Sequence, residues 1–211
     1  MPKEEAPLNH LAKYIPQSAL EDVLQYLIHY KVHLSITRKR ISVLGDYRHP
    51  LPGKNHRISV NGNLNPYNFL VTLLHELAHL VAFEKYRNRI QPHGREWQRE
   101  YGEILRHFID KNVFPADITA ALSENLHSAA ASSCGDEKLL RALKKYDRTN
   151  AKTVSVEQIY EQALFSTSDG RIFRRGKKLR TRFKCQEVAT GKWFLFNALY
   201  EVSRNDEEKN I

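Results

Sequence analysis

Three residues, His75, Glu76 and His79, carry the clearest chemical signal in this sequence. They form the pattern His-Glu-x-x-His inside a run of apolar residues that is typical of a buried helix. Because residues four apart lie on one face of a helix, His75 and His79 can present two imidazole nitrogens to one metal ion. Glu76 projects about 100° further round the helix, where its carboxylate can reach a metal-bound water. The pattern therefore predicts a catalytic zinc site.

A catalytic zinc ion needs a third protein ligand and one open position. His93 is the best placed of the other histidines, because Pro92 and Gly94 permit a sharp turn that brings the next helix back toward the metal. A surface histidine at the start of that helix would look the same. Three downstream glutamates compete with it and also match an ordinary solvated helix face: Glu96, Glu100 and Glu103. Spacing alone does not choose between these ligands.

Hydrophobic periodicity predicts a helix and three strands before the motif. A capping box at residues 18–21 begins the helix, which should end near Tyr30. Strands are expected at residues 32–37, 41–45 and 57–60. A loop rich in proline and glycine, residues 46–55, separates the last two. The expected result is a three-stranded, mainly antiparallel sheet between helices, with the short strand at residues 57–60 as a candidate to pair with an extended substrate.

Two helices should carry the motif and its third ligand. Asn65 and Pro66 form a strong helix start, so the motif helix should run from about Pro66 to about Tyr86. The helix after His93 has a core-facing stripe at three- and four-residue spacing: Trp97, Tyr101, Ile104, Leu105 and Phe108. Two shorter helices are expected at residues 117–126 and 136–146. The fold class is therefore α+β.

Four short motifs occur before, within and after the helix that carries His75 and His79. They lie in a characteristic order at residues 38–48, 56–65, 69–79 and 93–97. Over about residues 15–110 the chain resembles the SprT-like zinc metallopeptidases, a family that includes the eukaryotic Spartan proteases. The resemblance implies a zincin-like core and one catalytic Zn2+ held by His75, His79 and His93. It also implies that Glu76 activates a zinc-bound water, and that the substrates are proteins associated with DNA or crosslinked to it.

A smaller region begins where the pattern becomes that of strands, near residue 155. Residues 171–184 include eight basic residues and no acidic ones. On one strand, Arg180, Arg182 and Lys184 would share a face, which fits a nucleic-acid contact or, equally, a solvated outer face. Three aromatic residues would add base stacking if exposed, and otherwise form a small core: Phe173, Trp193 and Phe194.

Many SprT-like proteins carry a small zinc module with four cysteines at this position. Only Cys185 is present in this region, and the other cysteine, Cys134, lies in a stretch of small residues. We therefore expect a metal-free β appendage. The predicted parts are a SprT-like zinc metallopeptidase domain at 1–126, a linker and helix at 127–154, a small basic β-rich subdomain at 155–203 and a tail at 204–211.

The charge of the chain bears on its partners. A formal net charge of +9 and a pI near 9.5 favour acidic partners such as DNA. The sequence shows neither a signal peptide nor a run of about eighteen apolar residues, so we expect a cytoplasmic protein without a membrane partner. The leading prediction is a zinc endopeptidase that cleaves proteins or peptides. The alternative is a nucleic-acid-binding protein whose zinc site is structural or inactive, and the oligomeric state is not indicated.

Overall fold

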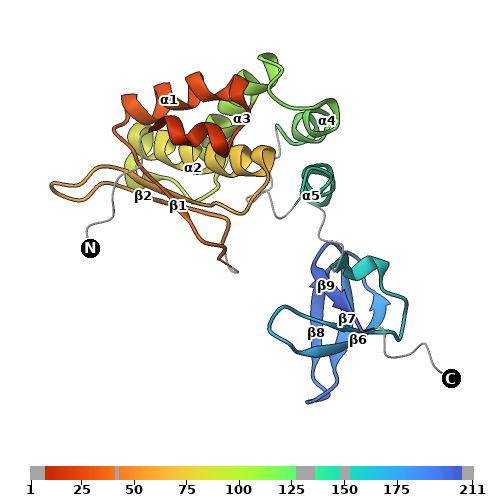
Figure 1. Ribbon diagram of the computed structural model, residues 1–211. Coiled ribbons are helices and arrows are strands. Elements are labelled where there is room, and N and C mark those ends of the chain that lie inside the picture. The colour runs from red at the N-terminus through yellow and green to blue at the C-terminus, as the bar shows by residue number, and fades with distance from the viewer. Residues whose placement is uncertain (1–7, 41–42, 127–135, 148–152, 206–211) are drawn as a thin grey trace. The chain divides into compact units, whose positions relative to one another are not determined.

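The computed structural model describes residues 8–40, 43–126, 136–147 and 153–205 (Figure 1). The chain forms two compact units, Met1–Asp147 and Arg148–Ile211, which we describe separately. The first unit combines helices with a three-stranded sheet and the second is built mainly of strands, which confirms the expected α+β class. Among the described residues, no helix is both long enough and apolar enough to cross a membrane.

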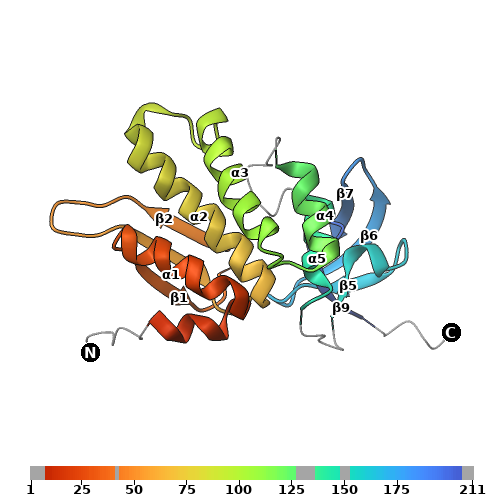
Figure 2. The same ribbon diagram turned by 90° about the horizontal axis from the view of Figure 1, so that it is seen from above.

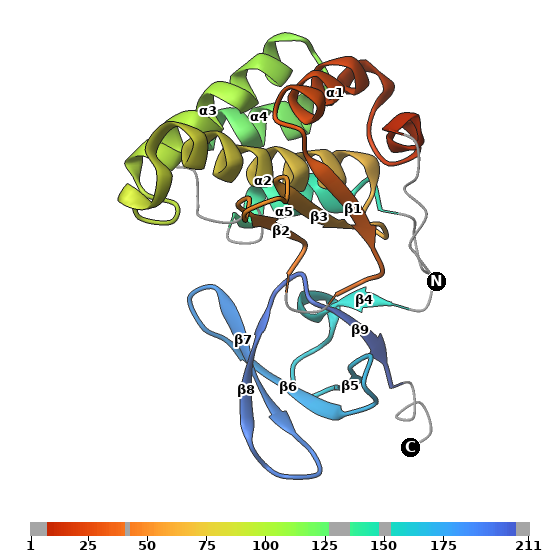
Figure 3. The same cartoon turned by 90° about the vertical axis from the view of Figure 1, so that its left-hand side faces the viewer.

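The first unit is organised around α2 (Pro66–Tyr86), whose side chains are buried on almost every face. Figure 3 shows α1, α2 and α3 on one side of the sheet. The bounds of α2 are those expected from sequence, because Asn65 caps it: the Asn65 side chain accepts hydrogen bonds from the backbone N–H groups of Tyr67 and Asn68. A long, buried helix of this kind is a rigid support for side chains in its middle.

The sheet has the order β1-β3-β2 and consists of β1 (His33–Thr37), β2 (Gly45–Arg48) and β3 (Arg57–Asn61). β3 pairs with β1 in parallel and with β2 antiparallel, so the expected mainly antiparallel sheet is wrong: the sheet is mixed. β3 is also the central strand. The expectation that it pairs with a substrate is therefore wrong, because both of its edges are already occupied.

β2 begins at Gly45, where the expected second strand was to end. The reason is the buried side chain of Asn61, whose amide nitrogen donates to the backbone carbonyls of Arg40 and Val43. Those carbonyls are bonded by a side chain instead of a neighbouring strand. Ile41, which belonged to the expected strand, lies outside the described residues. Pairing with β3 thus starts only after this turn.

Helix α1 (Leu20–His29) ends where expected, but the capping box predicted at residues 18–21 is wrong. A 3-10 helix, Gln17–Ala19, runs directly into α1, so Ser18 lies inside a helical turn instead of at the extended residue that a capping box requires. Another 3-10 helix, Leu8–Lys13, comes before it.

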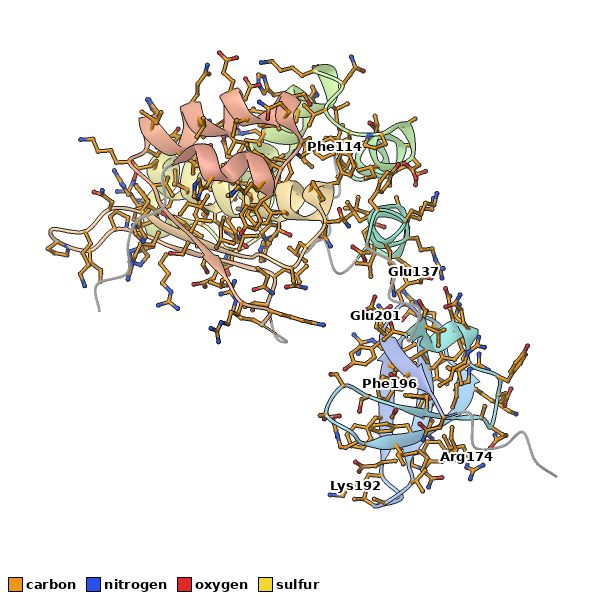
Figure 4. All side chains as sticks on the ribbon, in the orientation of Figure 1. Phe114, Glu137, Arg174, Lys192, Phe196 and Glu201 are labelled. Carbon is orange, nitrogen blue, oxygen red and sulfur yellow. The ribbon has the colours of Figure 1, made fainter. Side chains whose placement is uncertain are left out.

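Helix α3 (Arg95–Asp110) lies side by side with α2 (Figure 2). The five residues of its predicted stripe are all buried in the core: Trp97, Tyr101, Ile104, Leu105 and Phe108. α4 (Ala116–Asn125) and α5 (Glu137–Lys144) follow, close to their expected positions. In Figure 4, Phe114 lies between α3 and α4.

The first unit extends to Asp147 and includes α5, whereas the sequence placed the end of the first domain at residue 126 and this helix in a linker. α5 belongs to the core because it buries Leu139, Ala142 and Leu143 there. In addition, the Asn65 amide nitrogen donates to the Leu143 carbonyl at 2.9 Å and to the Asp147 carboxylate at 2.6 Å. The same side chain that caps α2 thus also holds α5.

The second unit contains a six-stranded sheet in which every neighbouring pair is antiparallel, in the order β4-β9-β5-β6-β7-β8. Its strands are β4 (Val154–Ser155), β5 (Leu164–Ser166), β6 (Ile172–Lys178), β7 (Arg182–Glu187), β8 (Trp193–Asn197) and β9 (Glu201–Arg204), with a 3-10 helix at Val156–Gln158. Phe165, Phe173, Phe183 and Phe196 meet in its core beside the buried Cys185. Phe196 lies inside this unit, whereas Lys192 lies near the tip of the β7–β8 hairpin (Figure 4).

A buried carboxylate, Asp22, joins α1 to the end of α3. Its oxygens accept hydrogen bonds from Lys111 Nζ at 2.6 and 2.7 Å and lie 3.0 Å from His107 Nε2. Burial acts to raise the pKa of Asp22, but the hydrogen bonds from Lys111 and His107 outweigh it and leave the pKa below its usual value. The ionised form of Asp22 therefore stabilises the fold.

We expect Asp22→Asn to lower the free energy of unfolding at about pH 7 by about 1–2 kcal/mol, toward the low end for charged hydrogen bonds because Lys111 is half exposed. Since the folded-state pKa lies below the unfolded value of about 3.9, the contribution is complete above that value and is lost as pH falls through the folded pKa. Urea unfolding, monitored by the circular dichroism of the helices, measures the free energy of unfolding. The difference between wild type and Asp22→Asn should become smaller in acid. Glu21→Gln, at an exposed neighbouring position, is the control, and an equal loss there would contradict the assignment.

Candidate metal centre

Three histidine side chains converge between α2 and α3. His75 and His79 lie one turn apart in the middle of α2, and His93 lies just before α3. The Nε2 atom of His75 is 3.2 Å from that of His79 and 3.2 Å from that of His93, and the last two are 2.9 Å apart. Within the described ranges, this is the one group of three ligand-type side chains arranged to hold a metal ion.

The backbone at His93 is shaped for this arrangement. α2 ends in the 3-10 helix η3 (Arg87–Arg89), and the chain then turns back into α3. His93 has φ of +58°, in the left-handed region that residues with side chains rarely adopt. Such backbone strain is concentrated at functional sites. The turn is held by the Gly94 N–H, which donates to the Gln91 carbonyl, and by Gln98, whose side chain donates to the His93 carbonyl.

The chemistry of these donors fits a metal ion. Four-coordinate tetrahedral geometry with metal–nitrogen bonds of about 2.0–2.1 Å places ligand nitrogens about 3.3 Å apart, close to the observed separations. Burial first, and then the neighbouring histidines, lower the pKa of His75 to about 3 and of His79 to about 4, and burial also lowers the pKa of His93. All three imidazoles are therefore neutral at physiological pH, which is the form that binds metals.

Trp97 holds the three imidazole rings in place. Its ring centroid lies 4.7 Å from that of His75, 5.1 Å from that of His79 and 4.7 Å from that of His93. Tyr101 stacks on Trp97, with centroids 4.9 Å apart, and also meets the His75 ring edge to face at 5.5 Å. The sequence pattern identified both residues only as core, because helical spacing shows which residues face inward and not which side chains they support.

Glu76 is buried against strand β2. The backbone N–H of Tyr47 donates to its carboxylate. A Cβ atom at Gly45 would lie only 2.6 Å from the nearer carboxylate oxygen of Glu76, so this position must be glycine for the strand to come so close. β2 thus has a direct part in placing Glu76, which the sequence pattern, with residues 46–55 read as a loop, did not reveal.

The environment of Glu76 favours a protonated carboxyl. Burial is the main cause and the charge of Asp46 adds to it, so the pKa of Glu76 rises to about 8 although Arg40 and the Tyr47 N–H oppose the shift. A divalent cation nearby would lower this pKa again, because an opposite charge favours the ionised form. The site is thus able to hold a proton or release it, depending on the charge beside it.

The competing glutamates do not join the histidines. Glu100 is buried and accepts hydrogen bonds from Lys85 Nζ at 2.5 Å and from the Tyr86 hydroxyl at 3.0 Å. Glu96 and Glu103 are exposed on α3. None of the three glutamates belongs to the group of His75, His79 and His93, so the fold favours the histidine over the glutamates as the third ligand.

The basic residues expected on one strand are divided by the structure. Arg182 and Lys184 share the exposed face of β7, but Arg180 lies in the bend between β6 and β7. The register β6–β7–β8 adds Arg174 to the exposed face, in line with Gln186 and Trp193. The sequence did not indicate Arg174, because only strand pairing shows which residues of neighbouring strands lie in one row.

Of the three aromatic residues considered for stacking, Trp193 is the exposed one, with 54% of its surface accessible. Phe173 is fully buried and Phe194 partly buried. The Trp193 ring lies 3.6 Å from where a Cβ atom of Gly176 would be, and the Lys184 ammonium lies 4.5 Å from its centroid. The indole therefore lies over the sheet next to a cation.

Comparison with known proteins finds a family match within the first unit. Residues 30–119 match the model of the SprT-like family. A protein named Protein SprT from Pseudomonas fluorescens (strain SBW25) is 54% identical over 35 residues, which cover 16% of this chain and 21% of the relative. Protein SprT from strain Pf0-1 is 59% identical over 27 residues, 13% of this chain and 16% of the relative.

The matched stretches thus span about a fifth of the length of these relatives. The comparison with solved structures found no match. The family match covers β1, β2, β3, α2 and α3, and with them all three histidines and Glu76. Residues 30–119 of this chain are thus similar to the SprT-like family, and they carry every residue of the candidate site.

Proposed function

We propose that this protein is a SprT-like zinc endopeptidase with a zincin-like core, in which His75, His79 and His93 hold one catalytic zinc ion and Glu76 transfers protons. The observation that supports it most is the convergence of three neutral imidazole nitrogens, with a buried carboxylate on the residue that follows the first of these histidines. Three nitrogen ligands leave the fourth position of a tetrahedral ion open, as catalytic zinc sites require and structural sites do not.

A bound zinc ion supplies Lewis-acid chemistry, since it polarises a carbonyl group and lowers the pKa of water toward about 7. Glu76 accepts the proton of the attacking water at its carboxylate as the new carbon–oxygen bond forms. It then donates this proton to the amine nitrogen as the peptide carbon–nitrogen bond breaks. The Tyr47 N–H and the missing side chain at Gly45 orient the carboxylate for both transfers.

We further propose that the substrates are proteins associated with DNA or crosslinked to it, and that DNA contacts the second unit. Described residues 153–205 contain ten Lys and Arg against five Asp and Glu, a balance of +5. On its sheet, Arg174, Arg182, Lys184 and Trp193 form an exposed face, which we call the basic face. Cations for phosphates next to an aromatic ring for bases suit single-stranded nucleic acid.

The second candidate is a nucleic-acid-binding protein whose zinc site is structural or inactive. The basic face favours it, because that face needs no peptidase activity to bind. The two functions differ in a simple way: only the peptidase requires Glu76, whereas only nucleic-acid binding requires the basic face.

Zinc binding is the first test. We expect the purified protein to bind one zinc ion per chain, and His93→Ala to lose most of this affinity because two nitrogens replace three. Metal analysis after dialysis against a weak chelator would measure both. His29→Ala removes an exposed histidine of α1 and is the matched control. Full zinc retention by His93→Ala would exclude His93 as a ligand.

Catalysis is the second test. Glu76→Gln should keep its zinc and lose cleavage of a denatured protein probe by at least about 100-fold, since the amide cannot accept the proton that a general base removes. The exposed Glu103→Gln serves as the control for loss of one carboxylate. Equal cleavage by Glu76→Gln and wild type, at equal zinc content, would exclude this role.

DNA binding is the third test. The variant Arg182→Ala/Lys184→Ala should bind single-stranded DNA more weakly. The slope of log K against log salt concentration should become shallower by about 0.7 for each lost phosphate contact, because fewer counterions are released. Lys13→Ala/Arg106→Ala removes the same charge from exposed positions of the first unit. Fluorescence anisotropy at several salt concentrations would compare them, and equal slopes for the two variants would contradict the proposed face.

A further inference from the structure

We infer that Tyr47 and His56 are positioning residues for Glu76: with Glu84 they form a side-chain relay that ties strand β2 back to helix α2 and so fixes the strand against the catalytic carboxylate. The inference rests on the proposed function in one respect, namely that Glu76 is catalytic. The contacts of the relay themselves do not depend on that function. Neither residue touches the three histidines of the metal centre in the contacts that the structure shows.

The relay is a continuous line of polar contacts. The Tyr47 hydroxyl lies 2.9 Å from His56 Nδ1, and His56 Nε2 lies 3.3 Å from the Glu84 carboxylate. Glu84 in turn accepts a hydrogen bond from Arg87 at 2.7 Å. The carboxylate end can only accept, so His56 donates from Nε2. Burial lowers the pKa of His56 and so favours its neutral form, in which Nδ1 accepts the Tyr47 proton.

This line closes a ring with Glu76. The Tyr47 backbone N–H donates to the Glu76 carboxylate, while the Tyr47 side chain leads through His56 to Glu84. Glu76 and Glu84 both belong to α2, eight residues and therefore about 12 Å apart along its axis. One residue of β2 is thus held by α2 from two separate points, which fixes both its position along the helix and its orientation.

β2 needs such support because it is a four-residue strand at the edge of the sheet. It pairs with β3 alone, so its ladder hydrogen bonds come from one side only. Its backbone must nevertheless approach Glu76 so closely that Gly45 has no room for a side chain. A short, one-sided strand held that close to a carboxylate requires attachment from outside the sheet.

The surroundings indicate that the polar relay has a purpose beyond filling space. The rings of Tyr47, His49 and His56 all pack around Phe83, at centroid distances of 6.5, 5.0 and 6.2 Å. Apolar packing would already be available at this place. The hydroxyl, imidazole and carboxylate add directed contacts that hold one geometry, whereas apolar groups of the same size would not. His49 packs in the same cluster and takes no part in the relay, so it supplies a matched control.

Four variants of the full-length protein test the relay: Tyr47→Phe, His56→Leu, His56→Gln and His49→Leu. Tyr47→Phe removes one oxygen atom, and His56→Leu removes both ring nitrogens. Glutamine at 56 can still accept at its oxygen and donate at its nitrogen, so it should rescue the relay. His49→Leu removes the ring that stacks on Phe83 and its contact with the Pro50 carbonyl, and leaves every contact of the relay in place. Thermal unfolding of each variant establishes that it is folded.

The first measurement is the rate of hydrogen exchange at the Tyr47 backbone amide, detected by NMR in the metal-free protein. We expect exchange at least tenfold faster in Tyr47→Phe and His56→Leu than in wild type, and unchanged exchange in His56→Gln and His49→Leu. Wild-type exchange in the first two variants would overturn the inference. Equally fast exchange in His49→Leu would also overturn it, because packing alone would then explain the effect.

The second measurement is cleavage of fluorescein-labelled casein by the zinc-loaded protein. Tyr47→Phe and His56→Leu should lower kcat about tenfold at unchanged KM and zinc content, since misplacement of a catalytic group acts on the chemical step. His56→Gln should restore kcat. An unchanged kcat in an active protein overturns the positioning role. If wild type cleaves nothing, the proposed function fails, and amide exchange alone decides whether the relay holds β2.

Discussion

The rest of this structure depends on two imidazoles and a carboxylate in the middle of an apolar helix, where His75 and Glu76 are buried and His79 is partly buried. Polar groups in such surroundings are costly unless each finds a partner. The fold surrounds these groups from two sides. α3 brings His93 and Trp97 to the two histidines of α2, and the sheet brings the backbone of β2 to Glu76. Under the proposed function, a metal ion would join the three Nε2 atoms.

The two sides of the site are built by different means. The histidine side relies on long helices, strong capping at Asn65 and ring packing on Trp97, all of which are rigid. The glutamate side relies on a short edge strand, and here individual contacts replace extended pairing: Asn61 fixes the loop that precedes β2, and the relay through His56 fixes the strand itself. The position of β2 relative to the Glu76 carboxylate is thus fixed by contacts of individual side chains.

The second unit carries the basic face, whereas the first unit carries the histidines and Glu76 of the candidate metal centre. Its core is a compact group of phenylalanines, so its fold needs no cysteine cluster. This frees the outer face of β6, β7 and β8 for Arg174, Arg182, Lys184 and Trp193. Under the proposed function, the basic face would bring the peptidase to its protein substrates through the nucleic acid to which they are attached, and this would limit an otherwise broad activity.

The elements that follow local rules were predictable from sequence. Asn65 and Pro66 set the start of α2, the spacing of its histidines put them on one face, and the stripe on α3 gave its buried residues. Features that depend on contacts between distant residues were not. The start of β2 depends on the Asn61 side chain, the parallel pairing of β1 depends on where β3 inserts, and no local pattern links Tyr47 to His56 across the loop between β2 and β3.

X-ray absorption at the zinc edge of the zinc-loaded protein tests the central claim most directly. The account predicts three imidazole nitrogens at about 2.0–2.1 Å and one further light atom from solvent, which is the open coordination of a catalytic site. A fourth ligand from the protein would contradict it, because the site would then be closed and structural. Failure of the protein to bind zinc at all would contradict it as well.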